Sequence, residues 1–191
     1  MELRDVRTAP PEFRRAAARI SLLLVAEALR SVPTVVTTVT TPLGPAEGRV
    51  VHTDIVVVPV LRAGLSMMDA VLQLVPSARV GHIGLQRDET TAVASRYYSK
   101  LPPDIGDSRV LMVDPMLATG GSSAAAIDLV KAAGARSIAL VCVISAPEGI
   151  EFLQKAHPDV DIYTPVVDRE LNARKFIVPG LGDFGDRLYG T

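Results

Sequence analysis

Three runs of this chain are almost continuously apolar, and they alternate with segments of helical pattern. The runs are DIVVVPV at residues 54–60, RVLMVD at 109–114 and SIALVCVIS at 137–145. Such runs are typical of parallel strands that are covered on both faces, because each face then packs against helices. RVGHIGL at 79–85 and DIYTPVV at 161–167 also have strand character. The pattern therefore favours a parallel sheet inside two layers of helices.

Helices are predicted between these strands, at residues 64–75, 122–134 and 147–157. In the second of them we expect Ser122 or Ser123 to be the N-cap and Gly134 to follow the last turn. Repeated strand–helix–strand order predicts an α/β fold, with an open, mostly parallel twisted sheet and right-handed crossovers. Ligands of such sheets bind beyond the carboxyl ends of the strands.

Composition limits the class of protein. The chain has 191 residues, of which 48% are apolar and 21% charged, with a formal net charge of −1. These values fit one globular domain and do not favour nucleic-acid binding. No apolar run is long enough to cross a bilayer, and the first residues lack an apolar signal core, so we expect a cytoplasmic protein. Cys142, the one cysteine, lies in an apolar run and is expected to pack.

A glycine-rich turn stands between the 109–114 run and the next helix. Asp114 ends the run, and Thr119, Gly120, Gly121 and Ser122 precede the helix. A turn of this kind presents unpaired N–H groups and the positive end of the helix dipole, and both favour a phosphate. A plain strand-to-helix turn without a ligand is the alternative. The commoner nucleotide motifs, a nucleophile elbow and a clustered metal site are all missing from the sequence.

The stretch VDPMLATGGSS resembles the loop of the phosphoribosyltransferases that binds 5-phosphoribosyl 1-diphosphate (PRPP). Its Asp-Pro-Met-Leu-Ala-Thr-Gly-Gly-Ser form is similar to that of the uracil phosphoribosyltransferases, within the type I family. Three further segments resemble that family: a diphosphate loop at residues 58–69, an arginine-bearing turn at 77–91 and a uracil-binding segment at 170–191. The resemblance covers roughly residues 54–191.

The resemblance implies a salvage enzyme that joins N1 of uracil to C1′ of PRPP and gives UMP and diphosphate. It implies the phosphoribosyltransferase fold as a single domain at residues 1–191, with a mobile flap at about 86–108 and a base-binding tail at about 168–191. Mg²⁺ is expected to arrive with PRPP, without dedicated protein ligands. A homodimer or higher homo-oligomer is expected, and GTP is a candidate effector because some relatives respond to it.

The PRPP-binding residues follow from the same resemblance. Asp114 would accept hydrogen bonds from the ribose hydroxyls, and Arg62 would grip the diphosphate as a bidentate donor. Gly64 would permit a strained backbone in the diphosphate loop. Arg87 would reach the leaving diphosphate from the flap, where Tyr97 is a weaker candidate for closing over PRPP. The turn at residues 118–123 would hold the 5′-phosphate. The PRPP-binding residues of this stretch are Pro115, Met116, Leu117, Ala118, Thr119, Gly120, Gly121 and Ser122.

The tail would recognise the base. Backbone groups of Ile177, Gly182 and Phe184 match the uracil contacts of the family, and fixed donors and acceptors can discriminate uracil from cytosine. Asp183 lies beside both substrates in the family. The resemblance therefore makes Asp183 and Arg87 the candidate catalytic residues, both acting electrostatically. The sequence indicates no clear general base.

Three tail residues depart from the commonest bacterial pattern of the family. Lys175, Phe176 and Phe184 stand where Gly, Tyr and Ala are expected. These departures leave two alternatives open. One is a phosphoribosyltransferase for another base, and the other is a regulator that senses PRPP or UMP and has reduced catalysis. A regulator that binds RNA should carry a basic face, and the sequence contains no run rich in Lys and Arg.

Overall fold

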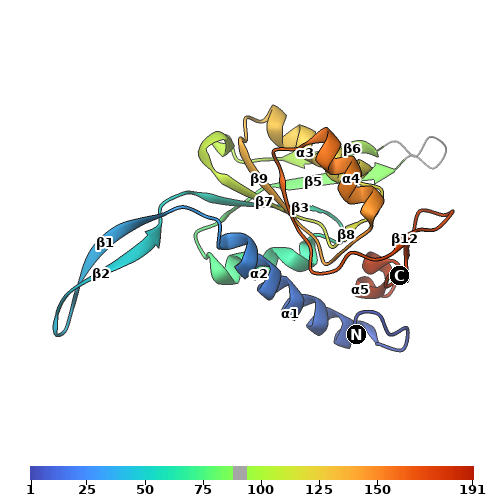
Figure 1. Cartoon of the computed structure of the whole chain (residues 1–191), viewed down its shortest axis with the longest axis horizontal. Coiled ribbons are helices and arrows are strands. Elements are labelled where there is room, and N and C mark those ends of the chain that lie inside the picture. The colour runs from blue at the N-terminus through green and yellow to red at the C-terminus, as the bar shows by residue number, and fades with distance from the viewer. Residues whose placement is uncertain (88–93) are drawn as a thin grey trace.

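A mostly parallel sheet forms the centre of the protein (Figure 1). The computed structural model describes residues 1–87 and 94–191, except for the side chains of residues 87, 94 and 95. Within them the sheet has seven strands, in the order β11-β9-β7-β3-β5-β6, with β4 beside β3. Only the β5–β6 pair is antiparallel. The strands are β3 (Ile55–Leu61), β4 (Arg79–Val80), β5 (His82–Arg87), β6 (Ala94–Lys100), β7 (Arg109–Val113), β9 (Ser137–Val141) and β11 (Asp161–Tyr163).

Helices cover the two faces of the sheet. α1 (Pro10–Leu29) and α2 (Leu65–Leu74) lie on one face, and α3 (Gly121–Ala132) and α4 (Pro147–Ala156) lie on the other (Figure 1). A short α5 (Phe184–Tyr189) ends the chain, and a single 3₁₀ turn η1 (Ile105–Asp107) precedes β7. None of the helices within the described ranges has the length and apolarity that a membrane span requires.

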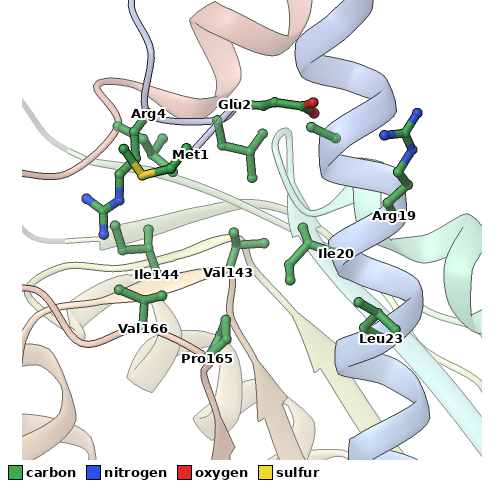
Figure 2. A pocket seen from close by; sticks show the side chains of 13 residues that line it. Met1, Glu2, Arg4, Arg19, Ile20, Leu23, Val143, Ile144, Pro165 and Val166 are labelled. Carbon is green, nitrogen blue, oxygen red and sulfur yellow. The ribbon is translucent and has the colours of Figure 1, made fainter.

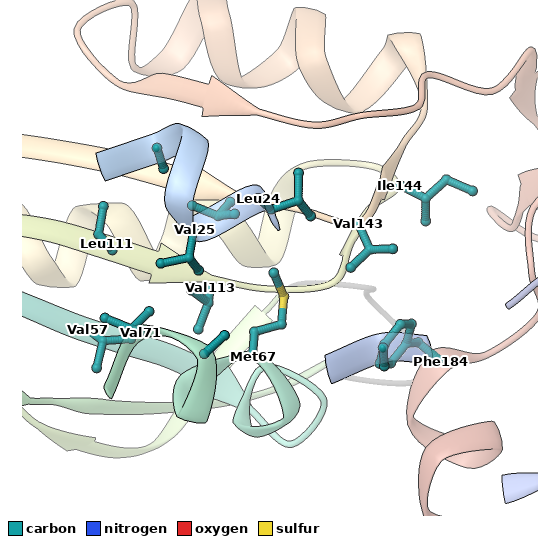
Figure 3. Packing of buried hydrophobic residues seen from close by; sticks show 14 of the residues in the cluster. Leu24, Val25, Val57, Met67, Val71, Leu111, Val113, Val143, Ile144 and Phe184 are labelled. Atoms are coloured by element: carbon teal, nitrogen blue, oxygen red, sulfur yellow. The ribbon is translucent and has the colours of Figure 1, made fainter. Parts of the chain in front are cut away.

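The alternation of side chains along the strands divides the core into two clusters. Val57 and Leu111 face α1 and α2 (Figure 3), whereas Val56 and Met112 face α3 and α4. Every residue of β7 is buried as a result. This double burial explains why the central strands are apolar throughout rather than alternating. The predicted fold class is therefore confirmed.

Two regions were not predicted from the sequence to be helix or strand. They are the long helix α1 and a hairpin that lies outside the central sheet. α1 begins with proline in its first turn, where the missing N–H costs nothing. The strands β1 (Thr34–Thr41) and β2 (Gly44–Val51) form an antiparallel hairpin that extends away from the body (Figure 1). All its side chains are exposed or half-buried, so no core pattern marks it.

Two predicted segments differ from the structure. Residues 86–108 were expected to be one long turn-rich loop, but residues 94–100 form β6 and pair with β5. The run at 137–145 is broken: β9 ends at Val141, and β10 (Ile144–Ser145) pairs with β8 (Met116–Leu117) outside the central sheet. β11 likewise stops at Tyr163, well before residue 167. Residues 88–93 of the predicted flap lie outside the described residues.

Candidate active site

Arg62 and Asp114 follow neighbouring parallel strands, so they lie at the same edge of the sheet. β3 pairs with β7 through Pro59 and Val113, and each predicted site residue comes shortly after its strand. The register of β3 and β7 therefore places Arg62 and Asp114 after the ends of adjacent strands.

Gly64 is needed for space rather than for an unusual backbone conformation. Its own φ of −58° is ordinary, so any help that it gives to the conformation of the loop comes from its small size. A Cβ at Gly64 would lie 2.4 Å from the carbonyl oxygen of Val113 and 2.6 Å from that of Val60. The diphosphate loop is thus packed directly against the strand end that carries Asp114. The peptide bond between Leu61 and Arg62 is cis.

The glycine-rich turn leads into α3 without a side-chain cap. The N-cap is Gly120, with φ of 82° and no side-chain hydrogen bond, so the prediction that Ser122 or Ser123 caps this helix is wrong. The first backbone N–H groups of α3 are therefore not satisfied by a capping side chain, which leaves them suited to an anion. A Cβ at Gly121 would have Thr119 Oγ1 as its nearest atom, at 3.8 Å, which leaves room on this side.

The first turn of α4 supports the glycine-rich turn from behind. A Cβ at Gly120 would lie 2.9 Å from Phe152 and 3.0 Å from the Gly149 carbonyl oxygen. A Cβ at Gly149 would in turn lie 2.4 Å from the carbonyl oxygen of Ala118. The turn is therefore held in place by backbone contacts that no larger residue would permit.

The predicted loop residues divide into a buried and a partly exposed group. The buried members contribute to packing and to the β8–β10 pair, and the carbonyl of Pro115 accepts hydrogen bonds from Val143 and Ile144. Buried are Pro115, Leu117 and Gly120, and half-buried are Met116, Ala118, Thr119, Gly121 and Ser122. The half-buried group is therefore the part that a ligand can reach.

Asp114 has an unusual protonation equilibrium. Desolvation by the surrounding protein raises the pKa of its carboxyl group to about 7, although a 3.4 Å hydrogen bond from the Met116 N–H to Oδ1 opposes the rise. The residue is half-buried rather than sealed from solvent. An incoming hydroxyl donor would stabilise the ionised form.

The tail ends in α5, and an aspartate caps the N-terminus of this helix. Asp183 is the N-cap, and its Oδ1 accepts a 2.9 Å hydrogen bond from the backbone N–H of Asp186. Phe184 turns its ring into the core, where it is 1% exposed and packs edge-on against Phe13 with centroids 5.0 Å apart. The phenylalanine that departs from the family pattern therefore fills the core, and only its backbone is left to face a base.

The chain before α5 makes two tight turns. The strands β12 (Glu170–Leu171) and β13 (Ile177–Val178) pair, and Lys175 between them has φ of 65°. This is the position at which the family pattern has glycine, so the lysine occupies a left-handed conformation. Gly180 and Gly182 also have positive φ.

The tail and the diphosphate loop touch each other. The Tyr189 hydroxyl donates a 3.2 Å hydrogen bond to the carbonyl oxygen of Arg62, whose Cζ lies 6.0 Å from the tyrosine ring centroid. A Cβ at Gly185 would lie 4.0 Å from that of Ala63. Sequence reasoning gave Tyr189 no role, and no signal pointed to it because the contact joins distant parts of the chain.

Two predicted flap residues lie on β5 and β6. Arg87 ends β5, and its side chain lies outside the described residues. The ring of Tyr97 covers the backbone of Gly84, where an added Cβ would lie 2.5 Å from the tyrosine Cζ. The structure thus gives Tyr97 a packing position on the sheet.

Neither a group of metal ligands nor the cavity described next suggests a different location for the active site. In the part of the chain that the structure describes, no three His, Cys, Asp or Glu residues are grouped as a metal site would need. A cavity of about 500 Å³ lies between the N-terminal segment, α1 and the chain around residues 143–144 and 165–166 (Figure 2). None of the predicted site residues lines it.

Comparisons with known proteins identify the family and the fold. The family model described as uracil phosphoribosyltransferase matches residues 1–191. A relative named uracil phosphoribosyltransferase from Dictyoglomus thermophilum is 55% identical over all of this chain and 92% of its own length. The solved AQ2163 protein from Aquifex aeolicus has a TM-score of 0.93 at 37% identity, over 99% of this chain and 91% of that one. A purine phosphoribosyltransferase from Pyrococcus horikoshii shares the fold, with a TM-score of 0.56 at 18% identity, over 81% of this chain and 85% of that one.

Proposed function

The chain belongs to the uracil phosphoribosyltransferase family, and from this premise we propose that it is a pentosyltransferase of pyrimidine salvage (EC 2.4.2.9). It transfers the 5-phosphoribosyl group from PRPP to N1 of uracil and releases diphosphate. One observation carries the proposal: the uncapped glycine turn after Asp114 and the loop of Arg62 lie at one sheet edge, and the predicted base-binding tail contacts that loop.

We propose that the edge of the sheet holds PRPP. The amides at the start of α3 and the hydroxyls of Thr119 and Ser122 bind the 5′-phosphate, and ionised Asp114 accepts hydrogen bonds from the ribose hydroxyls. Arg62, together with Arg87, binds the diphosphate. As the bond from C1′ to the diphosphate oxygen breaks, positive charge grows on the ribose and negative charge on the leaving group, so fixed opposite charges lower the barrier.

We propose that the tail presents the base to C1′. Backbone groups of Ile177, Gly182 and Phe184 pair with the O2, N3–H and O4 edge of uracil. Cytosine reverses the donor and acceptor at two of these atoms, which would leave buried polar groups unpaired. Asp183, at the start of α5 and one residue from Gly182, places a carboxylate near the developing ribosyl cation.

Mg²⁺ fits this site only as a companion of PRPP. Of the two carboxylates proposed for the site, Asp114 is half-buried and Asp183 is exposed, and Mg²⁺ commonly keeps several waters and binds substrate phosphates. The ion would neutralise charge on the diphosphate. Arg62 and Arg87 would then contact the diphosphate oxygens that remain free.

We further infer that residues 1–191 form one domain that works as a homodimer in the cytoplasm. The β1–β2 hairpin offers the surface for a second copy, because it extends from the body and exposes Val36, Val39 and Leu43. The tail at about 168–191 is the part that binds the base, and a flap within about 86–108 stays a prediction, part of which lies outside the described residues. GTP as an effector stays a prediction.

The proposal is tested by supplying PRPP and Mg²⁺ with one base at a time: uracil, cytosine, adenine, guanine and hypoxanthine. Formation of UMP and an equal amount of diphosphate with uracil alone is the expected result. Turnover with a different base would favour the alternative of another phosphoribosyltransferase. Binding of PRPP or UMP without turnover of any base would favour the regulator.

A further inference from the structure

An ion pair ties the N-terminal segment to the base-binding tail. Arg4 donates two hydrogen bonds to the carboxylate of Asp168, with Nη2 at 2.6 Å from Oδ1 and Nη1 at 2.8 Å from Oδ2. Asp168 is 8% exposed, and the pKa of its carboxyl group is lowered mainly by the hydrogen bond from Arg4. A bidentate pair of this kind fixes orientation as well as distance.

Both partners of this pair also bond to Gly180. Arg4 Nη1 donates to the Gly180 carbonyl oxygen at 2.9 Å, and the Gly180 N–H donates to Asp168 Oδ2 at 2.7 Å. Gly180 is buried, with φ of 62°, and a Cβ there would lie 2.1 Å from the carbonyl oxygen of Ile177. The Gly180 carbonyl is therefore held from 176 positions away in the sequence, and the Gly180 N–H is held by the carboxylate that pairs with the same arginine.

A second arginine strengthens the same attachment. Arg187 of α5 donates to the carbonyl oxygens of Leu3, Asp5 and Leu181, the last at 2.9 Å, and its guanidinium lies 4.5 Å from the ring centroid of Phe13. Figure 2 shows Met1, Glu2 and Arg4 over the cavity described above, so the segment crosses it as a strap between α1 and the tail.

We propose that Arg4 and Asp168 are positioning residues for the base: they fix the turn between Ile177 and Gly182, so the affinity for uracil depends on the N-terminal segment. The inference rests on the proposed function, because it takes this turn to be the base-binding one. Neither residue touches the base. Their effect is transmitted through the two peptide groups of Gly180, and PRPP, held at the ends of β3 and β7, is bound independently of them.

The test compares Arg4→Gln, Arg4→Lys and Asp168→Asn with a control, Arg7→Gln. Arg7 pairs with Asp5 in the same segment, but its side chain is 86% exposed and makes no contact with the tail among the hydrogen bonds of the described residues. Arg4→Gln and Asp168→Asn should raise the KM for uracil about tenfold or more, since a buried charged partner loses its pair. The KM for PRPP should stay within about twofold, and the ratio of uracil to cytosine turnover should fall.

Arg4→Lys keeps the positive charge but loses the bidentate guanidinium, so its KM for uracil should lie between those of wild type and Arg4→Gln. A folded Arg4→Gln in which the two KM values rise together, or in which neither changes, would overturn the proposal. Should Arg4→Gln not fold, Arg4→Lys decides by the same comparison, and an unchanged KM for uracil in that variant counts against the proposal.

A measurement that needs no turnover distinguishes failure of this inference from failure of the proposed function. Hydrogen exchange should be faster in Arg4→Gln than in wild type at the amides of residues 177–182, and equal at the amides of residues 119–124. Equal exchange in both regions would contradict the positioning role even in a protein that turns over no base.

Discussion

The Tyr189 hydroxyl donates a hydrogen bond to the backbone carbonyl of Arg62, 127 positions earlier in the chain and 3.2 Å away. This contact joins the last helix to the loop that follows β3. It attaches α5 to the predicted diphosphate-binding loop and so helps to position the backbone of Arg62.

Removing this hydroxyl should weaken PRPP binding. In Tyr189→Phe we expect the KM for PRPP to rise about two- to fivefold, on the scale of one partly exposed hydrogen bond. The melting temperature should hardly change. Tyr163→Phe is the matched control, because its hydroxyl bonds to Ser31 Oγ at 3.1 Å and not to a predicted site residue. Equal effects of the two substitutions would show that the Tyr189 contact does not position Arg62.

Asp183→Asn separates the structural role of this residue from its electrostatic role. Asparagine caps a helix as well as aspartate does, so the bond to the Asp186 N–H and the melting temperature should be retained. We expect kcat to fall about a hundredfold, the scale of loss for one preorganised electrostatic group. Asp186→Asn, one turn along the helix, should keep wild-type kcat. Near wild-type turnover in a folded Asp183→Asn would remove Asp183 from the mechanism.

Asp114→Asn should stabilise the ligand-free protein at neutral and higher pH. The pKa of Asp114 is about 7 in the folded protein against an ordinary 3.8, so the folded state binds more protons between these values. Its free energy of unfolding therefore falls as the pH rises through that window and is level above it. Asparagine does not titrate, so Asp114→Asn does not lose this stability as the pH rises.

The gain should appear as a rise of a few degrees in melting temperature at pH 8, since about 1 kcal/mol shifts a domain of this size by roughly 2–4 °C. At pH 4 the difference should vanish. PRPP binding should be lost at both values because the hydroxyl acceptor is weakened. Asp107→Asn, at a 96% exposed side chain, is the control, and an equal rise in it would contradict the account.

Lys175→Gly should stabilise the tail turn. A lysine with φ of 65° pays a left-handed conformational cost of about 1–2 kcal/mol, from which the extra chain entropy of glycine subtracts about 0.5–1 kcal/mol. We expect a net gain of roughly 0.5–1 kcal/mol in thermal or urea unfolding. Arg174→Gly changes the neighbouring residue, which lacks a positive φ, and should destabilise. A loss of stability in both variants would contradict this explanation.

The sequence predicts the central layers of the fold well, for a physical reason. Strands such as β7 are buried on both faces, and the resulting apolar runs are hard to mistake. The hairpin of β1 and β2 could not be found in this way, because it has no buried face and its exposed valines follow no core pattern. β6 was missed for a similar reason, since it is an exposed edge strand rich in polar residues.

The site residues likewise divide into those that the sequence could predict and those that it could not. The glycine turn could be identified because its chemistry is local, and the contacts at Gly120 and Gly149 explain its residue types. The roles of Tyr189, Arg4 and Asp168 depend on contacts between distant segments, which a single sequence does not reveal. The departure at Phe184 suggested a different base, yet its ring packs against Phe13 in the core. A residue's identity alone could not indicate which way its side chain turns.

The central claim is that one edge of the sheet holds the phosphate and the tail holds the base. A crystal structure of the protein with UMP tests it most directly. We predict the 5′-phosphate at the backbone amides of residues 119–122, the ribose hydroxyls at Asp114, and the uracil edge at the backbone of residues 177–184. A phosphate bound away from the turn that precedes α3, or a uracil ring seated in the cavity beneath the N-terminal segment, would contradict the account.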